Sequence, residues 1–423
     1  MGEQALPRTA ASQRYLLGVW ILMSVLTPLL GFLGARGFAP ALGVVGALSL
    51  YSFRPKGDDW AGFGLLILLA AWAALSALWS PATNLAVHSA KDLGRLTSLH
   101  LAMQILWSGA FVVATGRLTP NTAERALRWL SYGLVVLGLI LVEEGLSHAG
   151  VYQWAQRLIH KPVYESFAVR NVAVGGYVLA TLVWPVGTAL WLDRRRLVVL
   201  FLAAAVIFST VFLRGDSPSV AIVLSALVFL AVLAWGRAAI LGLAAATTAY
   251  WLATPWATLA LQSSGAIDEL HAHVPESWAR RLEIWTFTAD KWLDHPVRGW
   301  GLDASRMFKG FIQLHPHDGA IQIWFELGWP GAVLLAGFWA FLFWRIAKAV
   351  ETDERLFAAA ACATATVYLV IGSISFSLWQ EWWIALGALA LATCVALRRA
   401  VMLKRRPPGD QAAMAQTTTA RAA

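Results

Sequence analysis

The chain has 423 residues, of which 58% are hydrophobic and only 13% are charged. A soluble domain carries about 45–50% apolar and about 25% charged residues, so this composition excludes a soluble protein, a disordered chain and a disulfide scaffold. A membrane span needs roughly 20 apolar residues, and the length therefore predicts one bundle of roughly a dozen transmembrane helices.

Twelve segments are apolar and long enough to be candidate spans. The second and fifth are short, and the first is too long for the core of a cleaved signal peptide, so it is predicted to remain as a span. In chain order the segments are 15–33, 38–53, 60–79, 97–115, 127–142, 171–192, 197–213, 217–235, 238–256, 328–347, 356–378 and 382–397.

The basic residues predict the orientation of this bundle. With the N-terminus in the cytoplasm, cytoplasmic segments hold 20 of the 33 basic and 9 of the 24 acidic residues, a net charge of +11 that leaves −2 for the other side. Positive charge collects on the cytoplasmic side of membrane proteins. Both termini are therefore expected there, and the overall charge of +9 needs no nucleic acid partner to explain it.

Two connections on the outer side are long, near 143–170 and at 257–327. Long loops in compact proteins are usually functional. We expect four regions: nine spans in 1–256, a large periplasmic catalytic loop at 257–327, three spans in 328–397, and a basic, disordered cytoplasmic tail at 398–423. Within the large loop a helix over 279–293 is predicted, opened by Pro275 and Glu276 and ended before Pro296. On it, Arg281 and Trp285 are four residues apart and can stack on one face.

Arginines beside the membrane on the outer face oppose the usual charge bias. Arg170 precedes the sixth span, Arg214 follows the seventh, and Arg280 and Arg281 begin the loop helix. The planar guanidinium binds phosphate through two parallel hydrogen bonds, which are strong where water is scarce. These residues are candidate phosphate ligands; the alternative is snorkelling toward water or pairing with acids such as Asp216 or Glu283.

His317 is the best candidate for acid–base chemistry, because it follows Pro316 directly before a helix that enters the membrane. A neutral imidazole can take a proton from an alcohol near neutral pH. The next residue, Asp318, has two alternative roles: it caps the helix, or it raises the pKa of His317. The sequence contains no phosphate-binding loop, CxxC pair or Asp-x-Asp pair, so neither a metal nor a cofactor is expected.

Several motifs resemble the bacterial O-antigen ligase family. His317-Asp318, nine residues, then Gly328-x-x-Gly331 resembles the ligase signature, although an amide or hydroxyl is usual where Asp318 stands. Other elements are similar to those of the wider ligase and polymerase family. They are Arg281-Leu-x-x-Trp285, the turn Pro296-x-x-Gly299-x-Gly301, Glu326-x-Gly328, and Arg214-Gly215, with Leu213 in place of the usual Ser.

The resemblance implies an all-α, GT-C-like glycosyltransferase of the bacterial inner membrane, with its active site on the periplasmic face. Such an enzyme moves a glycan from undecaprenyl pyrophosphate to the outer sugar of lipid A–core, with inversion and without metal. It implies that His317 is the base, that Arg170, Arg214 and Arg281 hold the pyrophosphate, and that Arg280, Glu326, Asp318 and Trp285 support the site. The acceptor stays open, so an O-antigen polymerase and a protein O-oligosaccharyltransferase are alternatives. A lipid-linked glycan transporter is a different class, less favoured because the spans carry few ionisable residues.

Overall fold

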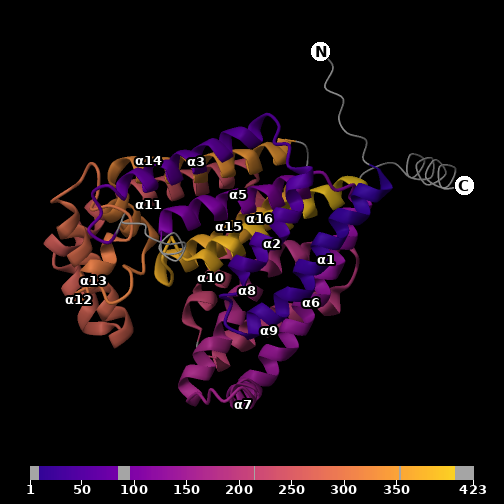
Figure 1. Ribbon diagram of the computed structural model, residues 1–423, viewed down its shortest axis with the longest axis horizontal. Helices are drawn as coiled ribbons and strands as arrows, with labels where there is room; N and C mark the ends of the chain where they lie inside the picture. The colour runs from indigo at the N-terminus through magenta and orange to yellow at the C-terminus, as the bar shows by residue number, and fades with distance from the viewer. Residues whose placement is uncertain (1–8, 84–95, 214, 352–353, 405–423) are drawn as a thin grey trace, which may run out of the picture.

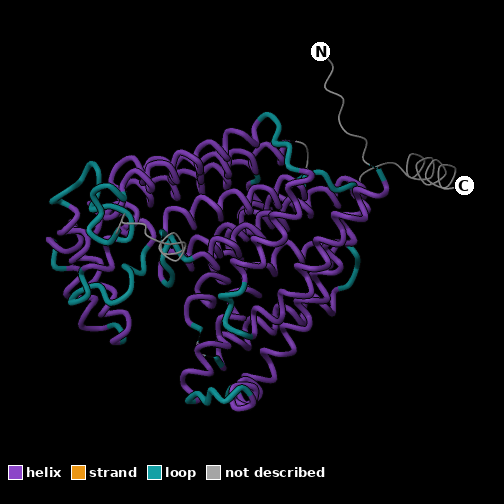
Figure 2. The backbone as a smooth tube through the Cα atoms, in the orientation of Figure 1, coloured by secondary structure: helices purple, strands orange, loops and turns teal. Residues whose placement is uncertain are grey.

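A computed structural model describes residues 9–83, 96–213, 215–351 and 354–404. In these ranges the chain is helical with connecting loops, and no strand occurs (Figure 2). The all-α prediction is confirmed. In a bilayer the backbone must satisfy its own hydrogen bonds, and a helix does so within one segment.

Among the described residues, ten helices are long and apolar enough to cross a membrane, and each coincides with a predicted span. They are α1 (Ala10–Phe32), α3 (Asp58–Ser76), α5 (Thr97–Thr115), α6 (Pro120–Leu146), α8 (Glu165–Leu192), α10 (Asp216–Trp235), α11 (Arg237–Ser263), α14 (Gly319–Glu351), α15 (Arg355–Ile374) and α16 (Glu381–Lys404).

The other two predicted spans are shorter helices. Segment 38–53 forms α2 (Phe38–Ser49) followed by the 3-10 turn η1 (Leu50–Ser52), and segment 197–213 forms α9 (Arg196–Phe212). The fifth span, predicted to be short, is instead the 27-residue α6, which begins with Pro120 in its first turn after the capping side chain of Thr119. Proline suits this position because its missing N–H would have no partner there.

The two long connections also contain helices. The first holds α7 (Gly150–Leu158); the second holds α12 (Ala266–His273), α13 (Glu276–Trp292) and the 3-10 turn η2 (Ala304–Met307). Figure 1 shows α12 and α13 as a lobe at one end of the molecule, with α7 at a separate corner. Helix α8 packs against α1, α6, α9, α15 and α16, so it lies centrally in the bundle, while α13 packs on α11 and α14.

Helix α14 begins nine residues before the predicted tenth span and is kinked at Gly328, which has a φ of +61°. A Cβ at this position would lie 2.2 Å from the carbonyl oxygen of Val297. The N–H of Trp329 donates to that same carbonyl at 3.0 Å. Glycine is therefore required here, because only its backbone can bend this way and approach the loop so closely.

Candidate active site

His317 lies in the loop that enters α14, and its backbone is left-handed with a φ of +60°. Its Nδ1 is 3.2 Å from the carbonyl oxygen of Ser375, at the end of α15. A carbonyl can only accept, so Nδ1 carries the proton and Nε2 of the neutral ring keeps a free lone pair. Burial and the positive charge of Arg281 lower the pKa of His317, while the Ser375 carbonyl opposes this. The neutral, basic form is therefore favoured near pH 7.

A second histidine, His315, supports this loop and was not singled out in the sequence. The backbone N–H of His317 donates to His315 Nδ1 at 3.1 Å, and the two ring centroids are 4.1 Å apart. Burial, followed by the charges of His317, Arg306 and Arg281, lowers the pKa of His315 to about 3. His315 therefore stays neutral, and its Nδ1 accepts the hydrogen bond from His317. In the sequence, the His-Pro-His pattern was the feature that could have indicated this role.

Helix α13 approaches the same loop from the lobe. The indole nitrogen of Trp285 donates to the carbonyl oxygen of Pro316 at 2.9 Å, directly before His317. Arg281 does not use the stacking partner that the spacing suggested, Trp285: its guanidinium lies 4.9 Å from the ring centroid of Trp278 instead. The hydrogen bond of Trp285 turns its indole toward the loop. Trp278, three residues before Arg281, is therefore the stacking partner of Arg281.

Arg281 is half-buried and faces the start of α10 and the middle of α8. It interacts electrostatically with Tyr177 and Asp216, while burial lowers its pKa. No ion pair within 4 Å joins it to an acid in the described ranges. Arginine remains protonated in proteins, so this is a cationic group with hydrogen-bonding capacity close to His317.

Hydroxyl groups complete the contact between the helices. Ser375 Oγ donates to Ser217 Oγ at 2.5 Å, and Tyr177 interacts with both hydroxyls and with Arg281. Sequence reasoning missed these residues; the serines at the ends of apolar spans were the only signal. The site is thus formed where α8, α10, α13, α15 and the loop before α14 meet.

The remaining arginines differ from Arg281. Arg170 is exposed in the first turns of α8, with its guanidinium 6.0 Å from the Phe167 ring centroid. It precedes Tyr177 by seven residues, which is two helical turns, so both lie on one face about 10 Å apart along the axis. Arg280 pairs with Glu283 at 3.2 Å, as the alternative reading predicts. Arg214 lies outside the described residues.

Asp318 acts as the N-terminal cap of α14. Its Oδ1 accepts the N–H of Ile321 at 2.8 Å and the hydroxyl of Tyr250 at 3.1 Å. Burial raises the pKa of Asp318 to about 6, against the effect of these hydrogen bonds. The groups that shift the pKa of His317 do not include Asp318. The capping contact is present as predicted, and we retain the capping role for Asp318 as a prediction.

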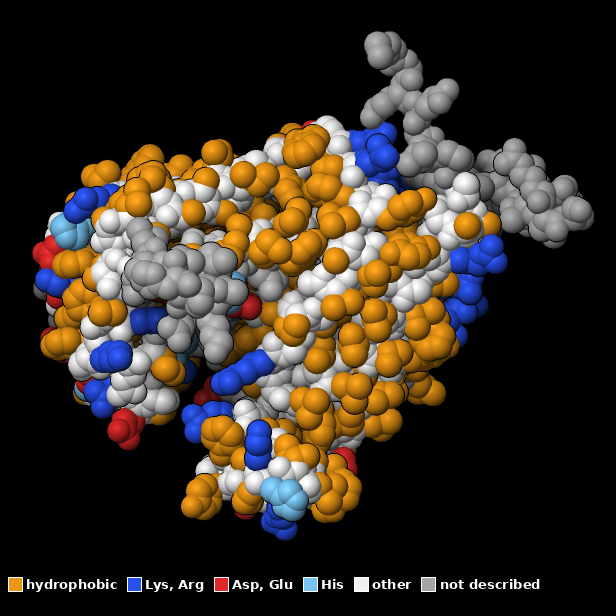
Figure 3. All heavy atoms as spheres, viewed as in Figure 1, with side chains coloured by type: hydrophobic (Ala, Val, Ile, Leu, Met, Phe, Trp, Pro, Cys, Tyr) orange, Lys and Arg blue, Asp and Glu red, His pale blue; other side chains and the backbone are white. Residues whose placement is uncertain are grey.

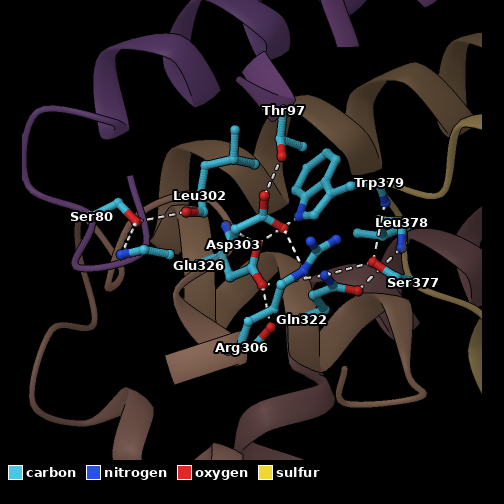
Figure 4. Close-up of polar contacts among 12 residues, drawn as sticks. Ser80, Thr97, Leu302, Asp303, Arg306, Gln322, Glu326, Ser377, Leu378 and Trp379 are labelled. Carbon is cyan, nitrogen blue, oxygen red and sulfur yellow. Dashed lines mark hydrogen bonds and ion pairs between the residues drawn. The ribbon is translucent and has the colours of Figure 1, made fainter. Parts of the chain in front are cut away.

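Glu326 is fully buried and holds the loop after α13 against α14 (Figure 4). Its carboxylate accepts from the N–H of Asp303 at 2.9 Å, the hydroxyl of Ser305 at 2.6 Å and the indole of Trp379 at 2.5 Å. Its backbone carbonyl accepts the N–H of Gly301 at 2.8 Å. The two family-like motifs, 296–301 and 326–328, therefore lie against each other, and Glu326 positions the loop.

The space-filling view shows how this region is shaped. The molecule is hollowed between the lobe of α12 and α13 and the corner that carries α7, and several Lys or Arg side chains, together with some Asp or Glu, lie along the edges of the hollow (Figure 3).

Comparison with known proteins agrees with these motifs. Residues 201–336 match the family model described as O-antigen ligase. Proteins from Rickettsia conorii and Rickettsia typhi, each named "Putative polysaccharide ligase", are 31% identical over 135 and 136 residues, which is 29% of this chain. A protein of the same name from Rickettsia bellii is 33% identical over 123 residues, or 26% of this chain.

These alignments cover about a third of the relatives' own length, at 32%, 33% and 29% respectively. The matched part of this chain contains Arg281, His317 and the Gly328 kink. The predicted resemblance to this family is therefore confirmed over residues 201–336, in a chain whose described ranges contain ten helices long and apolar enough to cross a membrane.

Proposed function

We propose that this protein is an O-antigen ligase, which transfers a glycan from undecaprenyl pyrophosphate to the outer sugar of lipid A–core. One observation carries the proposal: the neutral His317 ring, with Nδ1 bound to the Ser375 carbonyl, presents a basic Nε2 in a site that also contains Arg281. A base beside a cation is what the attack of a hydroxyl on a phosphate-activated sugar requires.

In the proposed reaction, the acceptor hydroxyl gives its proton to Nε2 of His317 while its oxygen attacks the anomeric carbon. The new carbon–oxygen bond forms as the bond to the pyrophosphate oxygen breaks, and the electron pair leaves with the pyrophosphate. One displacement inverts the anomeric configuration, and no covalent sugar–enzyme intermediate is formed. The proton on His317 is then released to solvent.

The leaving pyrophosphate carries the negative charge that develops in this step. We assign its binding to Arg281, with Arg170 on the adjoining face of α8 and with Arg214 from its place in the sequence. Fixed cations aimed at a developing charge lower the barrier without reorganising. This assignment needs no metal, so the proposed transfer should continue in excess chelator.

Trp285, Asp318 and Glu326 are proposed as positioning residues, and Arg280 as a minor contributor because it is paired and exposed. We place the enzyme in the bacterial inner membrane with both termini in the cytoplasm. The catalytic loop at 257–327 and the loop near 143–170 then face the periplasm, on the side where the donor glycan is displayed.

The products formed in a deletion strain test the proposal. Lipid A–core without long glycan, together with accumulated lipid-linked polymer, is expected, and the intact gene should restore capping while the His317→Ala variant should not. If the strain instead caps lipid A–core with single repeat units, the protein is an O-antigen polymerase. Loss of glycans from proteins alone would identify a protein O-oligosaccharyltransferase, and failure to move the donor across the membrane would identify a transporter.

A further inference from the structure

A second feature lies inside the bundle, and its charged end is far from His317. Helices α3, α5, α16, α15 and α14 form a ring in which each packs against the next. They surround a cavity of about 940 Å³ with predominantly apolar walls, which include Phe63, Val113, Leu342 and Leu391. The volume is at the upper end of ligand sites in proteins.

The two ends of this cavity differ in chemistry. One end reaches Trp251, Leu378 and Trp379, close to the start of α14. The other end is lined by six basic residues and two acids, a net charge of +4. The basic residues are Arg54, Lys56, Arg117, Arg345, Arg398 and Arg399; the acids are Asp58 and Asp59. Tyr51, also at this end, is 70% exposed, so the cavity is open there.

The basic residues have some partners within the protein. Arg345 pairs with Asp58 at 3.3 Å, and Arg398 pairs with Glu354 at 2.7 Å. The side chain of Arg54 is exposed, and no carboxylate in the described ranges pairs with it. When Glu354 is counted as well, six basic residues stand against three acids, so the residues at the mouth still have a net positive charge. The mouth lies about one membrane thickness from His317, since Gly319 and Arg345 are separated by roughly 40 Å of helix.

Water is a poor occupant of the walls, since a buried water molecule needs two to four polar partners. An empty cavity is also unfavourable, because the lining atoms lose their dispersion contacts. A hydrocarbon chain satisfies the walls, and an anionic headgroup at the mouth satisfies the charge. We propose that this cavity binds an anionic phospholipid from the adjacent leaflet, with its phosphate at the Arg54 and Arg345 end and its acyl chain between α3, α14 and α16.

The proposal can be tested on the full-length protein by native mass spectrometry in a neutral detergent. Phosphatidylglycerol and phosphatidylcholine with identical chains are added in equal amounts, and bound phosphatidylglycerol should predominate. The double variant Arg54→Gln/Arg345→Gln should lose about tenfold in this preference, since a charged hydrogen bond contributes about tenfold or more. The matched control, Arg14→Gln/Arg125→Gln, removes two exposed charges at the same end outside the cavity and should behave like the unchanged protein.

A phosphatidylglycerol with a photoreactive acyl chain gives the location. Cross-links are expected on α14 and α16 near Leu342 and Leu391, and Leu342→Trp should reduce them without changing any charge. Thermal midpoints in lipid-free detergent establish that each variant is folded. Equal binding of the two lipids, equal loss in the control pair, or cross-links confined to outer surfaces such as α9 would overturn the proposal. So would a polyprenyl phosphate that displaces phosphatidylglycerol and cannot be displaced by it.

Discussion

The backbone N–H of His317 donates to Nδ1 of His315, so the proposed base is held by a neighbour two residues earlier in the chain. Since His317 has a positive φ, this bond helps to maintain a conformation that non-glycine residues rarely adopt. The His315→Ala variant should lose several-fold in kcat, because a neutral hydrogen bond contributes about 0.5–1.5 kcal/mol. Donor KM should change little.

His315→Asn supplies another acceptor at a similar distance and should recover part of the lost rate in the same kinetic assay. If the alanine variant retains full kcat, or if asparagine is no better than alanine, His315 does not position the base.

Substitutions of Arg281 and His317 should have different effects on donor binding and on the rate of transfer. Arg281→Lys keeps the charge but loses the planar pair of donors, so donor binding and rate should both fall about ten- to a hundredfold. His317→Ala should leave donor binding intact and remove about 10²–10⁴-fold of the rate. Donor titration and single-turnover kinetics measure the two effects. An Arg281→Lys variant with unchanged binding would exclude Arg281 as a phosphate ligand.

The pH dependence provides an independent readout of the same pair. The proposed base His317 could accept a proton only when it is neutral, so the rate should fall as pH decreases through the pKa of His317. Burial and Arg281 lower the pKa of His317, which places the acidic limb below the ordinary value of 6.5. Arg281→Gln removes a positive charge, so the pKa of His317 should rise and the limb should move to higher pH. Arg280→Gln is the control, because Arg280 is exposed and paired, and an equal shift in both variants would contradict the assignment.

Asp318→Asn tests the position where this chain departs from the ligase signature. Asparagine caps helices about as well as aspartate and can still accept from Ile321. The variant should therefore stay active, with its acidic limb unchanged. A movement of that limb to lower pH by about a unit would mean that the carboxylate charge acts on His317 after all.

Much of the fold could be predicted because apolar length alone identifies a span in a bilayer. His317 and Arg281 could also be selected as site candidates from the sequence, since a motif marks His317 and a positive charge on the outer face marks Arg281. The meeting of Tyr177, Ser217 and Ser375 could not be predicted, because it depends on how α8, α10 and α15 pack. In spans that are apolar on all sides, the residue pattern does not indicate which face contacts which neighbouring helix. The stacking partner suggested for Arg281 differed for a related reason. Spacing along the helix allowed both Trp278 and Trp285, and the hydrogen bond from Trp285 to the Pro316 carbonyl leaves Trp278 as the partner.

Helix α13 carries both Arg281 and Trp285, one turn apart, and the indole of Trp285 donates a hydrogen bond to the Pro316 carbonyl, directly before His317. One helix therefore connects Arg281 with the loop that carries His317. In the proposed reaction, a donor that binds Arg281 through its phosphates would also shift the loop that carries His317. Such coupling would favour an ordered reaction, in which the acceptor is deprotonated only after the lipid-linked glycan is bound.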